Sequence, residues 1–406
     1  MKKLALFLGV AFLCGCSAYT SPEMDGREGD FIVPDGTPSP GGIEGNEGGG
    51  DQQTYAGKVT AGEWRDLDNW LFWSNLMTNS QIDQEGSDYT TYSSYWGFYT
   101  NNRVAVSVTD ASGAPQKDVP VQLVRLADGN KSVLYEARTD NKGQTNLWIG
   151  LTQLSREVDA SSLELVVNGY DLEQAVEVTV WGDEPKWNAC TMTVEAKPNI
   201  DIAFIVDATG SMYDEIAFLK ADLTSIISTV SGKHSDSKIR TAALFYRDEG
   251  DDYLTRHSDF SNNISTTTSF IDKQYADGGG DYPEAVHSAL EVGLQKLSWN
   301  EQNSIRLAFM LLDAPPHKND QVIASLQKSI PQYAKQGIRI IPVAASGVDK
   351  PTEFFLRFAA IATDGTYVFL TNHSGIGNDH IAATVGEYEV ELLNELMVRL
   401  IDEYLQ

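Results

Sequence analysis

The chain has 406 residues, which is enough for two domains with separate hydrophobic cores. Its formal net charge is −27 at pH 7, from 57 acidic residues against 30 lysines and arginines. This charge argues against nucleic acid as a partner, and against a membrane surface except through a lipid anchor. The same acidity suits a protein that collects divalent cations, but it equally suits a surface that is merely soluble.

Residues 1–15 have the features of an export signal. Lys2 and Lys3 precede an apolar run that is shorter than the roughly 20 residues needed to span a bilayer. The run ends in Leu13-Cys14-Gly15-Cys16, which resembles the bacterial lipobox and implies that Cys16 carries lipid. An ordinary signal peptide with an incidental cysteine is the alternative. We therefore expect a lipid-anchored protein of the cell envelope, in the outer membrane, on its periplasmic or its exposed face.

Residues 16–53 have the composition of a flexible tether, because their prolines and the Gly48-Gly49-Gly50 run cannot support a core. The first folded region is expected over residues 54–197. It opens with an aromatic-rich segment at residues 64–73, which contains three tryptophans, Trp64, Trp70 and Trp73. Packing of these rings into the core is the favoured interpretation, and a carbohydrate-binding platform is the alternative.

Strand patterns follow this segment. Valines alternate with small or polar residues from 104 to 109 and again from 119 to 123, on either side of a turn at residues 110–115. A second turn, residues 139–144, leads into another apolar stretch. The order of V-x-V-x-D-x-x-G-x-P and T-D-x-x-G elements resembles the carboxypeptidase regulatory-like β-sandwich, which implies a spacer or docking module. Cys190 has no partner for a disulfide, and we expect it to be a small buried residue.

Residues 198–406 alternate between apolar strands and amphipathic helices. The strands are expected at 201–206, 239–246, 304–312, 338–345 and 367–370, and the helices at 213–227, 283–297, 321–336, 351–362 and 387–405. The alternation predicts an α/β domain with a doubly wound, mostly parallel sheet, preceded by the smaller all-β sandwich. Ligands of such sheets bind beyond the carboxyl ends of the strands.

Three oxygen-bearing side chains follow the first of these strands. Asp207, Thr209 and Ser211 stand at alternate positions, so in an extended segment they share one side of the chain. Hard cations prefer such carboxylate and hydroxyl oxygens, without nitrogen or sulfur. The sequence therefore predicts a site for Mg²⁺, or for Mn²⁺ or Ca²⁺.

The D-x-T-x-S motif of this segment resembles the metal-ion-dependent adhesion site of von Willebrand factor type A (vWA) domains. Two further loops occur in the order of that family, ADGGGDYPEA at residues 276–285 and LLDAPPH at residues 311–317. The resemblance implies that Thr209 and Ser211 bind the metal directly, whereas Asp207 and Asp313 act through water and by orienting the hydroxyls. The family has a threonine in the second loop, but the second loop of this chain contains no threonine. Asp281 is expected as the fifth ligand, and Gly280 is the other alignment.

Two more residues are assigned to the rim of this site. Asp248 ends the second strand on the same edge of the sheet, where it either shapes the rim or pairs with Arg247. His317 follows the proline pair of the third loop, and we expect it to be a structural hydrogen-bonding group rather than a metal ligand. The acidic residues 248–252 do not match the spacing of an EF-hand loop, so solvation is favoured over calcium binding.

In the vWA family the metal keeps an open position that an acidic residue of a partner protein fills. We therefore expect metal-dependent protein–protein binding or adhesion. A scaffold or assembly subunit of an envelope complex is the alternative. A metal-dependent hydrolase is disfavoured, because the sequence has no G-x-S-x-G elbow, no H-E-x-x-H helix and no convincing histidine-based triad. We expect a protein that is not an enzyme.

Overall fold

The computed structural model describes residues 55–78, 89–153, 159–194, 199–235, 237–302, 304–377 and 379–406. The predicted export signal, the lipidation site Cys16 and the tether of residues 16–53 lie outside these ranges. Within the described ranges, no helix combines the length and the apolar character needed to cross a membrane.

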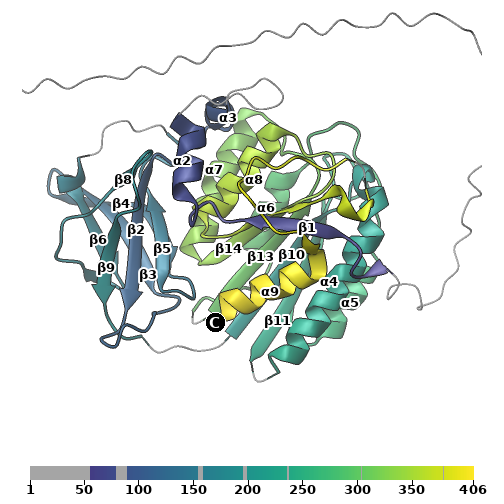
Figure 1. Cartoon of the computed structure of the whole chain (residues 1–406), viewed down its shortest axis with the longest axis horizontal. Helices are drawn as coiled ribbons and strands as arrows, with labels where there is room; N and C mark the ends of the chain where they lie inside the picture. Colours follow the sequence, from purple (N-terminus) through teal and green to yellow (C-terminus); the bar gives the residue numbers. More distant parts are fainter. Residues whose placement is uncertain are drawn as a thin grey trace, which may run out of the picture. The chain divides into compact units, whose positions relative to one another are not determined.

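An eight-stranded sheet forms the centre of the C-terminal domain, with the order β12-β11-β10-β13-β14-β15-β1-β16 (Figure 1). Its middle consists of five parallel strands, which are β11 (Lys238–Tyr246), β10 (Asn199–Asp207), β13 (Ser304–Leu312), β14 (Ile338–Ala344) and β15 (Tyr367–Leu370). Their near-continuous apolar sequences are typical of parallel strands that are covered on both faces. The five strands predicted from the sequence are confirmed to within a few residues.

Helices cover both faces of this sheet. On one face, α4 (Tyr213–Lys233), α5 (Ile264–Asp272) and α9 (Leu393–Leu405) share a buried cluster with one set of strand side chains. On the other face, α6 (Val286–Gln295), α7 (Asp320–Lys335) and α8 (Lys350–Ala362) share a second cluster with the alternate set. The doubly wound architecture expected from the sequence is therefore confirmed.

The edges of the sheet differ from the sequence prediction. The strand β12 (Thr255–Ser261) pairs antiparallel with β11, and neither it nor α5 was predicted. At the other end, β1 (Thr60–Trp64) pairs antiparallel with β15 and with β16 (Glu391–Leu392). The helix expected from residue 387 begins only at Leu393, because Glu391 and Leu392 are held in the sheet by β1.

The all-β region consists of two four-stranded sheets. The first has the order β5 (Gln144–Trp148), β2 (Asn102–Thr109), β8 (Thr179–Val180), with β9 (Trp187–Thr191) also paired to β2. The second has the order β4 (Asn130–Arg138), β3 (Pro120–Ala127), β6 (Leu163–Val167), β7 (Tyr170–Asp171). Inward side chains of both sheets, such as Val106 and Leu123, belong to one buried cluster. Cys190 lies in β9 and is 8% exposed, as expected for a small buried residue.

The aromatic-rich segment joins the two parts of the molecule. It forms α2 (Trp70–Thr78), which is followed by α3 (Tyr89–Trp96). The ring centres of Trp70 and Trp148, in the all-β region, are 6.0 Å apart. Trp73 stacks on Phe354 of α8 with 5.6 Å between the ring centres. Trp70 and Trp73 are buried, so these two rings belong to the core as expected, whereas Trp64 is half-buried. The expected boundary at residue 54 is not that of the sandwich, because β1 belongs to the C-terminal sheet.

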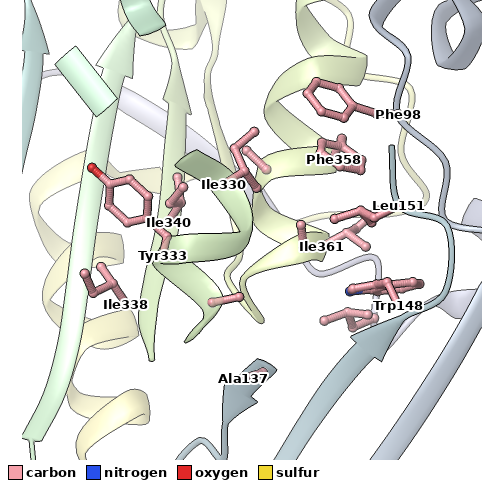
Figure 2. Close-up of a cluster of buried hydrophobic side chains, with 14 of the residues drawn as sticks. Phe98, Ala137, Trp148, Leu151, Ile330, Tyr333, Ile338, Ile340, Phe358 and Ile361 are labelled. Carbon is pink, nitrogen blue, oxygen red and sulfur yellow. The ribbon is translucent and has the colours of Figure 1, made fainter. Parts of the chain in front are cut away.

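The core is continuous across the junction. Figure 2 shows side chains of the all-β region, Trp148 and Leu151, close to those of α8. Phe98 stacks on Phe358 with 4.2 Å between the ring centres. Two buried polar contacts accompany the apolar ones, since Asp118 pairs with Arg306 at 2.9 Å and Asn146 Nδ2 donates to Asp364 at 2.6 Å.

Candidate metal centre

The predicted D-x-T-x-S residues lie together where β10 ends. Asp207 is the last residue of β10, and its buried Oδ1 accepts hydrogen bonds from the backbone N–H of Thr209 at 2.9 Å and from the Thr209 hydroxyl at 2.7 Å. The hydroxyls of Thr209 and Ser211 are 3.3 Å apart. Thr209 is buried whereas Ser211 is exposed, so the group reaches the surface at Ser211.

Asp313 reaches the same place from the neighbouring strand. It directly follows β13, which pairs with β10, and it is 5% exposed. Burial, and then the charge of Asp207, raise the pKa of Asp313, whereas a hydrogen bond with Ser211 opposes the shift. Burial likewise raises the pKa of Asp207 against its hydrogen bonds with Thr209. Asp207 Oδ2 and Asp313 Oδ1 are buried and make no hydrogen bond of normal geometry with the described residues, although the nearby Tyr246 hydroxyl opposes the pKa shift of Asp207.

The second loop contributes a residue that the sequence analysis did not assign. Glu284 is 2% exposed, and its Oε2 also lacks a hydrogen-bond partner among the described residues. Burial, and then the charges of Asp207, Asp248 and Asp313, raise the pKa of Glu284 to about 9. Glu284 belongs to the quoted ADGGGDYPEA motif, but the letters alone do not show which of its acids turns inward.

Asp281, the expected fifth ligand, is not brought to this cluster. Its side chain is exposed, and it makes no hydrogen bond or ion pair with the residues that the structure describes. The next residue, Tyr282, donates its hydroxyl to the carbonyl of Gly347 at 3.0 Å. The loop thus passes along the rim at Asp281 and turns inward only at Glu284.

The two predicted rim residues contact each other. His317 Nε2 lies 2.6 Å from Asp248 Oδ1, which gives His317 a hydrogen-bonding role. The alternative that Asp248 pairs with Arg247 is wrong. Arg247 instead donates to the carbonyls of Ala208 at 3.1 Å and Tyr275 at 3.0 Å.

Backbone contacts fasten the glycine-rich loop to the D-x-T-x-S loop. The N–H of Gly210 donates to the carbonyl of Gly278 at 3.2 Å, and the N–H of Asp277 donates to the carbonyl of Ala208 at 3.0 Å. Asp251 Oδ2 accepts from the N–H of Gly279 at 2.9 Å, so this acid positions the loop. Gly278 and Gly279 have φ values of 78° and 73°, a left-handed conformation that glycine adopts without strain.

Comparison with known proteins identifies the domain that carries this site. The profile of the von Willebrand factor A domain family matches residues 201–349. These residues form a vWA domain. The family typically mediates protein–protein interaction.

Two curated proteins share this vWA region with the chain. Alpha-protein kinase vwkA of Dictyostelium discoideum is 31% identical over 149 residues, which cover 36% of this chain and 23% of that protein. The putative ariadne-like RING finger protein R811 of Acanthamoeba polyphaga mimivirus is 32% identical over 118 residues, which cover 29% of this chain and 11% of that protein. The chain therefore spans less than a quarter of either relative.

A solved structure also resembles the chain. The crystal structure of the conserved hypothetical protein BatB from Bacteroides thetaiotaomicron matches 50% of this chain and 98% of its own chain. The sequence identity is 11% and the TM-score is 0.32.

A buried acid on α4 lies one turn beyond the vWA hydroxyls. Glu215 Oε1 is 3.1 Å from His380 Nε2 and accepts from the N–H of Ser346 at 3.2 Å. His380 also contacts Asn372, whose Oδ1 is 2.9 Å from the Nδ1 of the ring. The loop around His380, whose purpose the sequence did not show, therefore holds the first turn of α4 in place.

The donor set of the vWA site fits a hard cation. Its unpartnered buried atoms are carboxylate oxygens, and hydroxyls lie beside them. A buried carboxylate without a partner is costly, and coordination to a cation removes that cost. No group of three or more His, Cys, Asp and Glu side chains in the described ranges has the geometry of a metal site by itself. A cation here would therefore depend on the hydroxyls of Thr209 and Ser211 as well.

Proposed function

We propose that this protein binds a divalent cation at its vWA site and uses it to bind a partner protein. The cation is Mg²⁺, or Mn²⁺ or Ca²⁺ in its place, and the partner contributes an acidic side chain. The observation that carries the proposal is the convergence of Asp207 and Asp313, each with a buried and unpartnered oxygen, beside the hydroxyls of Thr209 and Ser211.

The two hydroxyl residues and the two carboxylate residues have different roles in this proposal. Thr209 and Ser211 supply neutral oxygens, so the cation keeps most of its charge for an incoming carboxylate. Asp207 fixes the Thr209 hydroxyl through the 2.7 Å hydrogen bond, and Asp313 lies on the other side within reach of Ser211. Ser211 is exposed, which leaves this side of the site open to a partner.

The setting of the domain supports a binding protein in the cell envelope. In this proposal Cys16 carries a lipid anchor, residues 16–53 form a leash, and the vWA domain presents its metal edge at a distance from the membrane. Reversible binding of a ligand favours adhesion, whereas stable co-purification of one partner favours the role of an assembly subunit. Chemical cross-linking in cells would recover the partner in either case.

Titration calorimetry with MgCl₂ tests the metal site. Asp207→Ala frees the Thr209 hydroxyl, and the loss of such an orienting group lowers metal affinity by roughly 10–100-fold. Asp214→Ala is the matched control, because Asp214 is an exposed acid at the start of α4. Wild-type affinity in Asp207→Ala, or an equal loss in both variants, contradicts the proposed site.

A further inference from the structure

Glu284 is positioned by the second and third loops together. Its N–H donates to the carbonyl of Pro315 at 2.8 Å, and it forms an isolated β-bridge with Pro316, three residues beyond Asp313. The contact fixes the inward turn of the second loop by a backbone pairing that does not depend on the Glu284 side chain. The side chain is therefore available to interact with a ligand.

The Glu284 carboxylate lies against the D-x-T-x-S loop. A Cβ atom at Gly279 would stand 3.1 Å from Glu284 Oε1 and 3.4 Å from the Cβ of Thr209. The glutamate and the threonine thus flank the same glycine, and a larger residue there would separate them. This close approach places the Glu284 side chain in the cluster that contains Thr209.

No positive side chain among the described residues balances the buried acids. Asp207, Asp313 and Glu284 form no ion pair with any of them. Arg247, directly after β11, is buried, but it is occupied by backbone carbonyls and by Asp277, 3.8 Å away. His317 faces Asp248. Three buried carboxylates without a counter-charge repel one another, and a divalent cation between them relieves that repulsion.

We infer that Glu284 is a ligand of the metal and takes the position where the resemblance implied a threonine. The inference rests on the proposed function, and it replaces the expectation for Asp281. Glu284 then adds a third carboxylate to the site, and because acidic side chains alone do not form a metal-binding group here, the hydroxyls of Thr209 and Ser211 complete the site. Such a site holds the cation tightly and leaves it less charge for a partner than a site with two carboxylates and three hydroxyls.

The test compares Glu284→Gln with Asp281→Asn in the full-length chain, with MgCl₂ alone as the probe. Both changes remove one negative charge from the same loop and preserve the size of the side chain. Glu284→Gln is expected to weaken Mg²⁺ binding by about 10–100-fold, as loss of a group at a metal site commonly does. Asp281→Asn is expected to stay within about threefold of wild type, since its side chain is exposed. MnCl₂ should give the same order of affinities.

A second measurement separates metal binding from folding. The melting temperature of each variant is recorded in chelator and in saturating Mg²⁺. Glu284→Gln is expected to match or exceed wild type in chelator, because the amide removes the cost of burying an ionisable acid, and to gain less from Mg²⁺. If Glu284→Gln does not fold, Glu284→Asp replaces it, and the shortened carboxylate should give a smaller loss of affinity.

The outcomes distinguish this inference from the proposed function. Equal affinity in wild type and Glu284→Gln overturns the role of Glu284, and a loss confined to Asp281→Asn restores Asp281 as the ligand. If the wild type itself binds neither Mg²⁺ nor Mn²⁺, the proposed function fails and the inference falls with it.

Discussion

At the scale of single residues, the fold leaves several acids buried without a cation. Asp222 on α4 is an example outside the candidate site. It is fully buried, its Oδ1 accepts from the N–H of Gly57 at 2.6 Å, and its Oδ2 has no partner among the described residues. Burial raises the pKa of Asp222 to about 6, against the opposing effect of the Gly57 hydrogen bond. The native state therefore holds a proton on Asp222 more tightly than the unfolded chain does.

The raised pKa predicts the direction of a pH effect on stability. Between the ordinary pKa near 3.8 and the folded value of about 6, the native state binds more protons, so stability falls as pH rises through this range. Asp222→Asn removes the cost of the buried charge and should increase the free energy of unfolding at pH 7.5 by on the order of 1–3 kcal/mol. Urea unfolding at pH 4 and pH 7.5 checks this. If Asp222→Asn raises the free energy of unfolding equally at both pH values, or lowers it at pH 7.5, the argument is contradicted.

The sequence predicted most of the side chains that lie together at the candidate site. Asp207, Thr209 and Ser211 could be placed because they follow a recognisable buried strand, and Asp313 could be placed for the same reason. Glu284 could not, because side-chain direction in the second loop is set by the left-handed glycines and by the bridge to Pro316. These are tertiary contacts that spacing along the chain does not encode. The one available signal was the presence of this acid in a motif already quoted.

At the scale of elements, the strands and helices of the sheet centre followed from apolar runs and helical periodicity. The elements that were missed are short, exposed or paired with distant sequence. The strand β12 has only half-buried and exposed residues at the sheet edge, and β1 lies more than 300 residues before its partner β15 in the sequence. A pairing at that separation in sequence leaves no local pattern. The core role expected for the aromatic-rich segment is confirmed for Trp70 and Trp73.

The helix α2 offers a direct test of that core role. Trp73 is fully buried, stacks on Phe354 and donates its indole N–H to Thr100 at 2.8 Å, whereas Leu71 on the same helix is 43% exposed. Trp73→Ala should lower the free energy of unfolding by about 3–5 kcal/mol, the usual cost of deleting a buried tryptophan. Leu71→Ala is the matched control and should cost less than about 1 kcal/mol. Similar values for both variants in urea unfolding would show that the segment does not join the core.

At the scale of the whole molecule, the metal edge and the all-β region lie at opposite ends of the vWA strands. The proposed metal-binding residues Asp207 and Asp313 stand at the carboxyl ends of β10 and β13. The polar contacts to the all-β region involve Arg306, near the start of β13, and Asp364, shortly before β15. These polar contacts of the all-β region therefore lie at the ends of the strands opposite Asp207 and Asp313.

The continuous core predicts that the two parts unfold together. One buried cluster includes side chains of both β-sheets of the all-β region, of α2 and α3, and of α6, α7 and α8. The vWA sheet also depends on β1, which lies before the all-β region in the sequence. Calorimetry should therefore show one cooperative transition for the folded part of the chain, and residues 199–406 expressed alone should be much less stable because they lack β1 and the packing at the junction. Two separated transitions, with the second unchanged in residues 199–406, would disprove this coupling.

If the two parts unfold together, removing the charge of Asp118 at the junction should lower the stability of the whole folded chain. Asp118 pairs with Arg306 at 2.9 Å and with Arg138 at 2.5 Å, and Arg306 is fully buried. Asp118→Asn preserves the shape and suits the positive φ of 56° at this position, but it leaves Arg306 without its counter-charge. Breaking a buried ion pair in this way costs roughly 3–5 kcal/mol.

The control variant Asp171→Asn removes an exposed acid that pairs with Lys131 in the same all-β region, and it should cost less than about 1 kcal/mol. If Asp118→Asn lowers the single transition as one unit, the all-β region and the vWA domain form one cooperative body. If it splits the transition in two, the junction is a weaker contact between independently stable domains.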